Sequence, residues 1–289
     1  MKISELLLKK EITVSCELFP PKTGTDLSQI ETVLQDTAAL SPDFISVTYG
    51  AAGSTSKRTL EIATKLQRDY HTTALAHLTC VASTKQQIAE TVRSFEKDGI
   101  ENILALRGDI PNDCDFPSPR HYRYACELIE DIRRQGNFCI GAACYPEGHI
   151  ECEHRERDID FLKQKVESGV DFLTTQMFFD NNVLYQFLYR ILARGIHVPV
   201  IAGIMPVTNS RQIKRSCELS GTVLPPRFQA IADRFADNPG AMKQAGISYA
   251  TEQIIDLIAN GVTHIHIYTM NKPDIASKIM NNLSDIIGK

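Results

Sequence analysis

The chain has 289 residues, and its 35 Asp and Glu side chains against 31 Lys and Arg give a formal net charge of −4 at neutral pH. Hydrophobic residues make up 43% and charged residues 23%, which are ordinary proportions for a globular protein. This composition excludes a mainly disordered chain and a nucleic-acid binder that depends on overall positive charge. The length suits either two modest domains or one large α/β barrel.

Eight short apolar runs rich in β-branched residues predict β-strands. In chain order they are residues 12–19, 44–50, 73–80, 102–109, 138–145, 172–179, 198–205 and 264–269. Amphipathic stretches between them predict helices at residues 26–40, 57–69, 85–98, 119–135, 156–168 and 183–194. The interval before the eighth run is the longest and holds helical stretches at 212–219, from Pro225-Pro226 onward, and at 249–260.

Capping residues support these boundaries. Thr84 can cap the helix that follows it, and Gly99 ends that helix. A Gly followed by Ile or Val leads back towards a strand at residues 99, 169, 195 and 261. This recurrence is a weak internal repetition of a strand–helix unit and not a solenoid period.

Eight strands that alternate with helices predict a (β/α)₈ TIM barrel, with residues 1–289 forming one catalytic domain. The alternative is a doubly wound open sheet. An open sheet that binds a dinucleotide usually carries G-x-G-x-x-G after its first strand, and this sequence has no such match. No Ser-, Gly- or Pro-rich linker divides the chain.

The eight cysteines form no C-x-x-C pair. Three of them, Cys139, Cys144 and Cys152, lie near His149 and His154, but the spacings fit no common metal site, and we expect no bound metal. Reduced thiols are typical of a cytoplasmic protein. The N-terminal segment lacks the apolar core of a signal peptide, and no apolar stretch approaches the roughly 20 residues that cross a bilayer. We therefore expect a cytoplasmic location.

Polar residues recur at the carboxyl ends of the predicted strands, where barrel enzymes collect their catalytic groups. They include Glu17, Tyr49, His77, Arg107, Asp109, Tyr145, Gln176 and Lys272. One such residue would carry little weight, but a ring of them around one mouth predicts a site.

Each of these residues has a functional and a purely structural interpretation. Glu17 lies in an apolar run, where burial would raise its pKa and suit a general acid, or it forms a salt bridge at the rim. Asp109 follows Arg107 by two residues, so both would lie on one side of an extended strand, as site residues or as an ion pair. His77 points into the barrel as a ligand or as a core residue. Lys272 is an anion clamp or a solvated lysine.

Eight motifs at the strand ends, in order along nearly the whole chain, resemble the 5,10-methylenetetrahydrofolate reductase family. They are Glu17-Leu-Phe-Pro-Pro-Lys, Val47-Thr-Tyr-Gly-Ala, Ala76-His-Leu-Thr-Cys, Leu106-Arg-Gly-Asp, Ala143-Cys-Tyr-Pro-Glu, Thr175-Gln-Met-Phe-Phe-Asp, Gly203-Ile-Met-Pro-Val and Tyr268-Thr-Met-Asn. The length resembles the bacterial type, which is the catalytic barrel alone. The resemblance therefore implies no inhibition by S-adenosylmethionine through a regulatory domain.

The resemblance implies an enzyme with non-covalent FAD, which NADH or NADPH reduces and which then reduces 5,10-methylenetetrahydrofolate to 5-methyltetrahydrofolate for methionine synthesis. It implies that Glu17 is the general acid that protonates N10 of the folate and opens its five-membered ring. It also implies that the negative charge of Asp109 stabilises the resulting iminium cation and tunes the flavin.

Other roles are carried over by position. The residues that match FAD-contacting positions are Thr48, Tyr49, His77, Arg107, Gly108, Asp109, Tyr124, Ala125, Ala143, Tyr145, His149, Asp158 and Lys165. The residues that match substrate-binding positions are Glu17, Asp109, Gln176, Gln212 and Lys272, of which Gln176 also meets the nicotinamide. Ser216 stands where enteric relatives have a stacking Phe, and Phe228 is our candidate to replace that ring.

Family members are commonly homodimers or homotetramers, so the resemblance implies self-association. The sequence leaves two alternatives open. The barrel could be one subunit of a larger complex of the acetogen type, with a metal or iron–sulfur partner and another electron donor. It could also be an unrelated barrel lyase or aldolase, which would need a Schiff-base lysine or metal ligands at the strand ends; the sequence offers neither.

Overall fold

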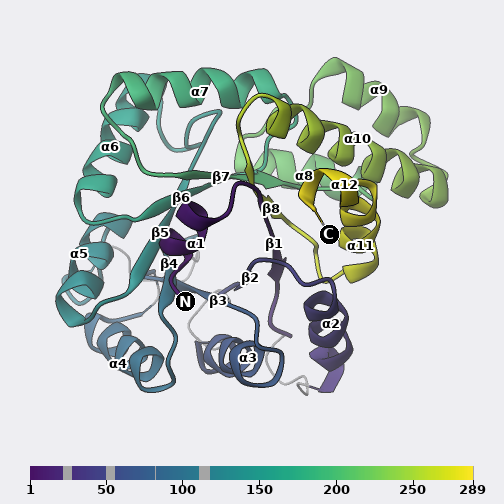
Figure 1. Cartoon of the computed structure of the whole chain (residues 1–289). Coiled ribbons are helices and arrows are strands. Elements are labelled where there is room, and N and C mark those ends of the chain that lie inside the picture. Colours follow the sequence, from purple (N-terminus) through teal and green to yellow (C-terminus); the bar gives the residue numbers. More distant parts are fainter. Residues whose placement is uncertain (22–27, 50–55, 82, 111–117, 289) are drawn as a thin grey trace.

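Eight parallel strands close into a barrel in the computed structural model of the chain, which describes residues 1–21, 28–49, 56–81, 83–110 and 118–288 (Figure 1). The strands pair in sequence order, and β8 closes on β1. Their bounds are β1 Thr13–Leu18, β2 Ile45–Val47, β3 Ala74–Thr79, β4 Asn102–Leu106, β5 Cys139–Cys144, β6 Phe172–Thr175, β7 Val200–Ile204 and β8 His264–Ile267. The predicted (β/α)₈ barrel is confirmed.

Helices surround the barrel in the described ranges. They are α1 Ile3–Lys9, α2 Ser28–Ala39, α3 Ser56–Asp69, α4 Lys85–Lys97, α5 Ala125–Gln135, α6 Arg155–Glu167, α7 Asn181–Ala193, α8 Ser210–Ser220, α9 Pro226–Arg234, α10 Pro239–Ala259, α11 Pro273–Asn282 and α12 Ser284–Ile287. No helix of the described residues is long and apolar enough to cross a membrane.

The predicted cap of α4 is confirmed. Thr84 and Gln87 form a capping box, in which each side chain bonds the backbone N–H of the other. Gly99, at φ +75°, follows the end of the helix.

Several predicted boundaries are wrong. The helix predicted at residues 119–135 begins only at Ala125, because the segment before it is a series of turns whose Arg120 carbonyl accepts from the backbone N–H of Lys85 at the start of α4. The helix predicted at 249–260 begins at Pro239 instead, where Asn238 caps it. Strands β2, β4 and β6 end three or four residues earlier than predicted, because the chain leaves the ladder to build the loops at the mouth.

Helix α1, which the sequence analysis did not predict, closes the amino-terminal end of the barrel. Its Ile3, Leu6 and Leu7 are buried in one apolar cluster with side chains of the barrel interior, namely Phe44, Leu75, Leu104, Cys139, Phe172 and Ile201. Asn102, the first residue of β4, accepts a hydrogen bond from the N–H of Ile3 at 2.8 Å and donates one to the carbonyl of Ala74 at 3.2 Å. The lumen is therefore sealed below by apolar side chains, and polar groups can gather only above this layer.

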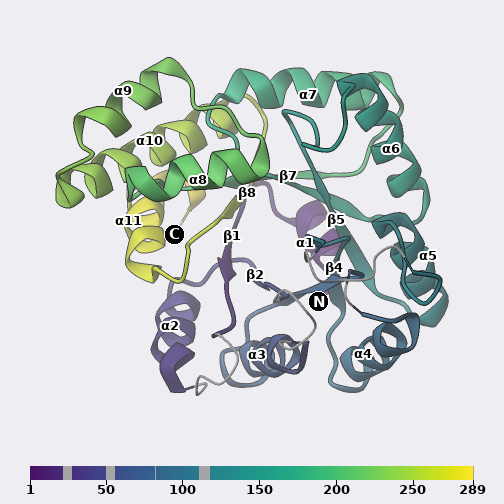
Figure 2. The same cartoon turned by 180° about the vertical axis from the view of Figure 1, so that it is seen from behind.

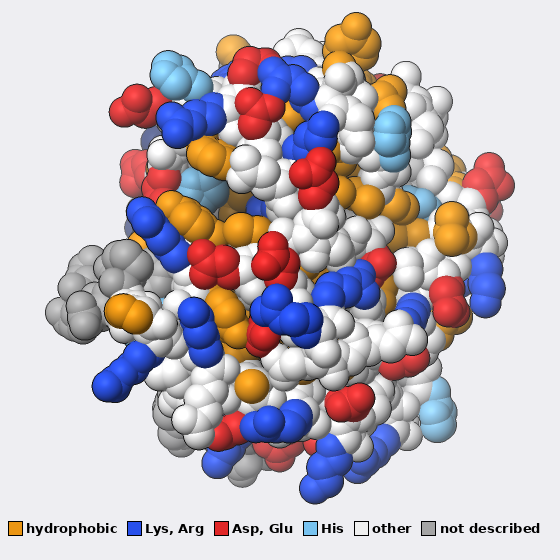
Figure 3. All heavy atoms as spheres, turned by 90° about the vertical axis from the view of Figure 1, so that its left-hand side faces the viewer, with side chains coloured by type: hydrophobic (Ala, Val, Ile, Leu, Met, Phe, Trp, Pro, Cys, Tyr) orange, Lys and Arg blue, Asp and Glu red, His pale blue; other side chains and the backbone are white. Residues whose placement is uncertain are grey.

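The flank formed by α5 and α6 has an outer surface of mixed charge, where Lys and Arg are interspersed with Asp and Glu (Figure 3). Arg194, which follows α7, pairs with Glu156 and Asp160 of α6 and ties two neighbouring helices together. Such exposed pairs contribute little to stability, so the fold depends chiefly on the apolar layer between the barrel and its helices.

The packing of α1 against the barrel floor should contribute to the free energy of unfolding. Leu6→Ala should lower the free energy of unfolding by about 2–4 kcal/mol, because the truncation leaves a cavity against the barrel floor. Leu8→Ala on the same helix is the matched control, since Leu8 is 83% exposed and should change stability by less than about 0.5 kcal/mol. Urea denaturation of the two variants makes the comparison, and equal losses would contradict the sealing role of α1.

Candidate active site

The candidate site lies at the carboxyl ends of the strands, on the face opposite α1 (Figure 2). Glu17 is the penultimate residue of β1, where it is in register with Ser46 of β2 and only 7% exposed. Burial raises the pKa of its carboxyl to about 8. The carboxyl is therefore mostly protonated at neutral pH.

His77 of β3 is the titratable partner of Glu17, with its Nε2 4.0 Å from Glu17 Oε2. It is buried, and burial lowers the pKa of its imidazole to about 3. Its Nε2 has no hydrogen-bond partner among the described residues. The two side chains thus form a neutral pair rather than an ion pair, and within the described ranges the carboxyl of Glu17 has no Lys or Arg within 4.0 Å. Among the described residues, Glu17 therefore does not form the salt bridge at the rim that was the structural interpretation of this residue.

A second buried histidine lies below this pair. The Ser15 hydroxyl donates to the carbonyl of Ile265 at 3.0 Å and lies 2.7 Å from Nδ1 of His266. Because that hydroxyl hydrogen is already used, His266 donates from Nδ1, and its Nε2 accepts from the Ser46 hydroxyl at 3.1 Å. Burial, with a smaller effect of His77, lowers the pKa of His266 to about 3. This network is neutral and fully satisfied, so it forms a floor under the Glu17–His77 pair.

Arg107 and Asp109 do not form the ion pair considered from their spacing. Strand β4 ends at Leu106, and Gly108 has φ +83°, so the extended geometry behind that expectation is lost. Arg107 instead makes a two-pronged salt bridge to Glu151, with N–O distances of 2.6 and 2.7 Å. Asp109 is exposed at the mouth.

Gly108 cannot carry a side chain without displacing its neighbours. A Cβ there would lie 2.9 Å from Val81 Cγ1 and 3.0 Å from Thr79 Cβ, and its positive φ is unfavourable for other residues. The backbone of the turn after β4 therefore packs directly against Thr79 and Val81, and only glycine fits at position 108.

Five residues predicted from the resemblance, Ala143, Tyr145, His149, Asp158 and Lys165, come together at the end of β5. Lys165 of α6 donates to the carbonyl of Ala143 at 2.9 Å, and the rings of Tyr145 and His149 meet edge to face with centroids 4.7 Å apart. Asp158 accepts from the backbone N–H of His149 at 3.2 Å. Burial lowers the pKa of Lys165 and raises that of Tyr145 to about 12.

The remaining predicted positions also lie at the mouth. Thr48 and Tyr49 follow β2 and are half-buried, and the backbone N–H of Thr48 bonds the carbonyl of Leu18. Tyr124 precedes Ala125 at the start of α5, and its ring, 48% exposed, lies 5.2 Å from the guanidinium of Arg123.

A groove between the ends of β7 and β8 contains two of the predicted substrate residues, Gln212 and Lys272, together with Ser216. The ammonium of Lys272 donates to Thr208 Oγ1 at 3.1 Å. Gln176 does not line this groove; it follows β6, and its Oε1 accepts from the backbone N–H of Met177. Met205 and Met270, which the sequence analysis did not single out as binding residues, supply the flexible apolar walls of the groove.

Phe228 cannot replace the stacking ring that Ser216 lacks, so this expectation is wrong. The side chain is 1% exposed and stacks between Phe179 and Tyr249, with centroid distances of 5.4 and 4.2 Å. Its position after Pro225-Pro226 gave no sign of this burial, which depends on packing between α9 and α10.

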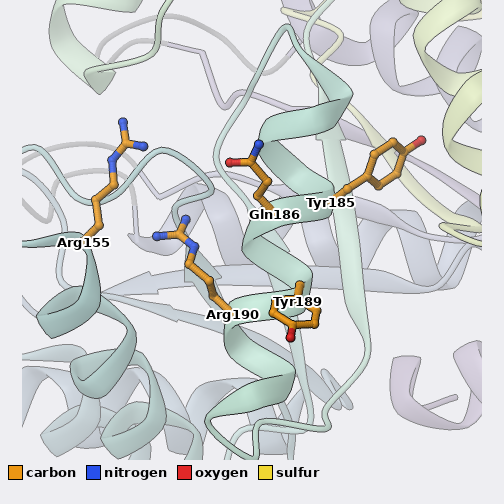
Figure 4. A pocket seen from close by; sticks show the side chains of 5 residues that line it. All are labelled: Arg155, Tyr185, Gln186, Tyr189 and Arg190. Carbon is orange, nitrogen blue, oxygen red and sulfur yellow. The ribbon is translucent and has the colours of Figure 1, made fainter.

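A separate hollow of about 490 Å³ lies on the outer flank, lined by Arg155, Tyr185, Gln186, Tyr189 and Arg190 of α6 and α7 (Figure 4). It contains none of the residues predicted for the site. No group of three or more His, Cys, Asp or Glu side chains within the described ranges is arranged to hold a metal ion.

The fold and this mouth define a class: (β/α)₈-barrel proteins with a buried, protonated acid at the carboxyl ends of the strands. Comparison with known proteins narrows the class. The sequence profile described as methylenetetrahydrofolate reductase matches residues 2–284. The 5,10-methylenetetrahydrofolate reductase of Pectobacterium carotovorum is 32% identical over 276 residues, which cover 96% of this chain and 91% of that protein. The chain belongs to the methylenetetrahydrofolate reductase family.

Two further comparisons concern the length of a relative and the fold. Methylenetetrahydrofolate reductase (NADH) 1 of Arabidopsis thaliana is 34% identical over 98% of this chain, but the chain spans only 50% of that protein. A solved structure from Clostridium thermocellum, described as an uncharacterized protein that binds two copies of 5-methyl-5,6,7,8-tetrahydrofolic acid, aligns with a TM-score of 0.67. That alignment covers 100% of this chain and 99% of the other at 13% identity, so it supports the fold alone.

The close packing around Tyr268 generates a prediction. A Cβ on Gly203 would lie 2.5 Å from both Tyr268 Oη and the Thr175 carbonyl, which are hydrogen-bonded to each other. Gly203→Ala should therefore displace the tyrosine and lower the free energy of unfolding by about 1–3 kcal/mol.

Gly240→Ala is the matched control, because the nearest atom there is 3.6 Å away. Near the start of α10, the added methyl should leave stability unchanged or raise it by up to about 1 kcal/mol. Thermal unfolding of both variants tests the difference, and an unaffected Gly203→Ala protein would refute the packing argument.

Proposed function

We propose that the chain is a flavin-dependent reductase that converts 5,10-methylenetetrahydrofolate and NADH or NADPH, with one proton, into 5-methyltetrahydrofolate and the oxidised nicotinamide. The observation that carries this proposal is the buried neutral pair of Glu17 and His77 at the barrel mouth. Family membership supplies the substrate class, and the name of the Arabidopsis relative supports NADH as a donor. The product would supply the methyl group for methionine synthesis.

Glu17 supplies the proton. The O–H bond of its carboxyl breaks as the hydrogen passes to N10 of the folate, and the N10–methylene bond then opens to leave a 5-iminium cation. A carboxyl with a pKa of about 8 is protonated at neutral pH, which an exposed glutamic acid would not be. His77 stays neutral beside it and offers no positive charge that would lower this pKa. The exposed carboxylate of Asp109 would stabilise the cation from the rim.

The residues at the ends of β3, β4 and β5 fit FAD. The buried Nε2 of His77 lacks a partner among the described residues, and the ammonium of Lys165 bonds only one described acceptor, the Ala143 carbonyl. Arg107 would add a second cation suited to a diphosphate by exchanging its bonds to the carboxylate of Glu151 for phosphate oxygens. Tyr124 adds an exposed ring. When bound, the flavin would accept a hydride from the nicotinamide and deliver it to the one-carbon unit of the folate.

The groove of Gln212 and Lys272 would bind the tail of the folate. The glutamate end of folate is anionic, whereas the chain has a net charge of −4, so overall attraction does not draw the substrate in. A local cation must do so, and Lys272 is half-buried within the groove. It would act as a point charge rather than a two-pronged clamp.

Replacing the acid separates the two half-reactions. Glu17→Gln should leave flavin reduction by NADH within about twofold, while it slows folate reduction by about 10²–10⁴-fold, because the amide has no proton of suitable acidity. Anaerobic stopped-flow absorbance of the purified holoenzyme measures both steps. Glu252→Gln, an exposed glutamate paired with Arg227 on the outer surface, is the control.

In the unmodified protein, folate reduction should be constant below a pH of about 8 and fall about tenfold per pH unit above it, as Glu17 loses its proton. Equal losses in both half-reactions of Glu17→Gln would rule out the general-acid role. So would a flat pH profile.

Removing the charge of Lys272 tests whether its groove binds the glutamate end of the folate. Lys272→Met should weaken binding of 5-methyltetrahydrofolate by about 5–20-fold, with a difference from the unmodified protein that shrinks at high salt. Lys214→Met is the control, because Lys214 is an exposed lysine of α8 that does not line the groove. Titration at two ionic strengths makes the measurement; unchanged affinity, or a loss independent of salt, would count against the role of Lys272.

A further inference from the structure

The loop between β8 and α11 is bonded to the end of β1 on both sides of Leu18. The Thr269 hydroxyl donates to the carbonyl of Glu17 at 2.6 Å. The side-chain amide of Asn271 accepts from the N–H of Phe19 at 2.8 Å and donates to its carbonyl at 2.9 Å. Three hydrogen bonds therefore hold the short segment that carries Glu17.

These bonds begin where the backbone ladder stops. Strands β1 and β8 pair from Thr13↔His264 to Cys16↔Ile267 and no further. Beyond that point the side chains of Thr269 and Asn271 satisfy backbone groups that a longer β8 would otherwise satisfy. Glu17 is the first residue of β1 past the end of this pairing, so on the β8 side its backbone depends on this loop.

The loop adopts a costly conformation. Met270 and Asn271 have φ angles of +53° and +56°, in the left-handed region that Asn tolerates and Met does not favour. Such strain persists only where the surroundings enforce it, and it is concentrated at functional sites. Here the enforcing contacts are the bonds of Thr269 and Asn271 to β1.

The same loop also lines the groove of Gln212 and Lys272. Met270 and Lys272 line that groove beside Gln212, and the N–H of Lys272 bonds the carbonyl of Thr269 at 3.0 Å. One four-residue segment thus contacts the acid's backbone on one side and the groove on the other. The carboxyl of Glu17 has no hydrogen bond to a described residue, so its position relative to the groove depends on the backbone.

We propose that Thr269 and Asn271 are positioning residues, which fix the carboxyl of Glu17 in register with a folate bound in the groove of Gln212 and Lys272. This inference rests on the function proposed above. A displacement of about 1 Å at a reacting group can cost about 100-fold in rate, so the hydrogen bond to the carbonyl of Glu17 and the two to the backbone of Phe19 are sufficient to matter.

The test compares two variants of one buried side chain. Thr269→Val keeps the shape and removes the hydroxyl, and it should slow folate reduction at saturating folate by about 10–100-fold. Thr269→Ser restores the hydroxyl and should recover the rate to within about threefold. Asn271→Gly removes the amide but tolerates the positive φ, so it provides a second variant that should behave like Thr269→Val.

Three readouts distinguish positioning from a general structural effect. Flavin reduction by NADH should stay within about twofold in all three variants, since the loop touches the acid and not the residues assigned to the flavin. The dissociation constant of 5-methyltetrahydrofolate should change by less than about threefold in Thr269→Val. The pH above which folate reduction falls should move downward in Thr269→Val, because a displaced carboxyl gains water and its pKa returns towards the ordinary value.

The proposal is overturned if Thr269→Val and Asn271→Gly match the unmodified protein in rate and pH profile. It is also overturned if Thr269→Val and Thr269→Ser lose rate equally, or if both half-reactions slow together. The Glu17→Gln protein keeps this result separate from the proposed function. If Glu17→Gln abolishes folate reduction while Thr269→Val is unaffected, only the positioning role fails; if Glu17→Gln remains active, the acid assignment itself fails.

Discussion

The desolvation of one carboxyl group is the constraint on which the site depends. Glu17 is 7% exposed, and His77, whose Nε2 lies 4.0 Å from the carboxyl of Glu17, is itself too buried to hold a charge. Removing both groups from water favours the neutral form of each, which raises the pKa of the acid and lowers that of the base. Had His77 been exposed, its neutral imidazole would have accepted the proton from Glu17 and left a salt bridge in place of an acid.

The barrel generates this environment in layers. Helix α1 and the apolar side chains of the lower lumen exclude water from below. The network of Ser15, Ser46 and His266 forms the next layer and uses its own hydrogen-bonding groups completely. The acid pair lies above it, and the cationic and aromatic groups of the loops surround the mouth. Among the described residues, Glu17 is therefore shielded from below, at the carboxyl-end mouth of the barrel.

Much of the barrel and part of the site could be predicted from the sequence. Alternating apolar runs and helical stretches were sufficient for eight strands, and Glu17 was recognisable because a carboxylate is costly inside an apolar run. Helix α1 escaped prediction because seven residues are too few for a helical period to stand out. Three other features could not be predicted because they join residues far apart in the sequence, and no local pattern encodes such contacts. Arg107 pairs with Glu151 44 positions away, and Phe228 packs on Tyr249 21 positions away. Asn271 bonds Phe19 across 252 positions.

The central claim, that Glu17 is a protonated acid at neutral pH, is tested most directly by infrared difference spectroscopy between the unmodified holoenzyme and Glu17→Gln across a pH titration. We expect a C=O band of a protonated carboxyl in the unmodified holoenzyme at neutral pH, lost with a midpoint of about 8 and absent from Glu17→Gln. A carboxylate signal from Glu17 already at neutral pH, with a midpoint near the ordinary value for glutamic acid, would show that Glu17 is not a protonated acid at neutral pH.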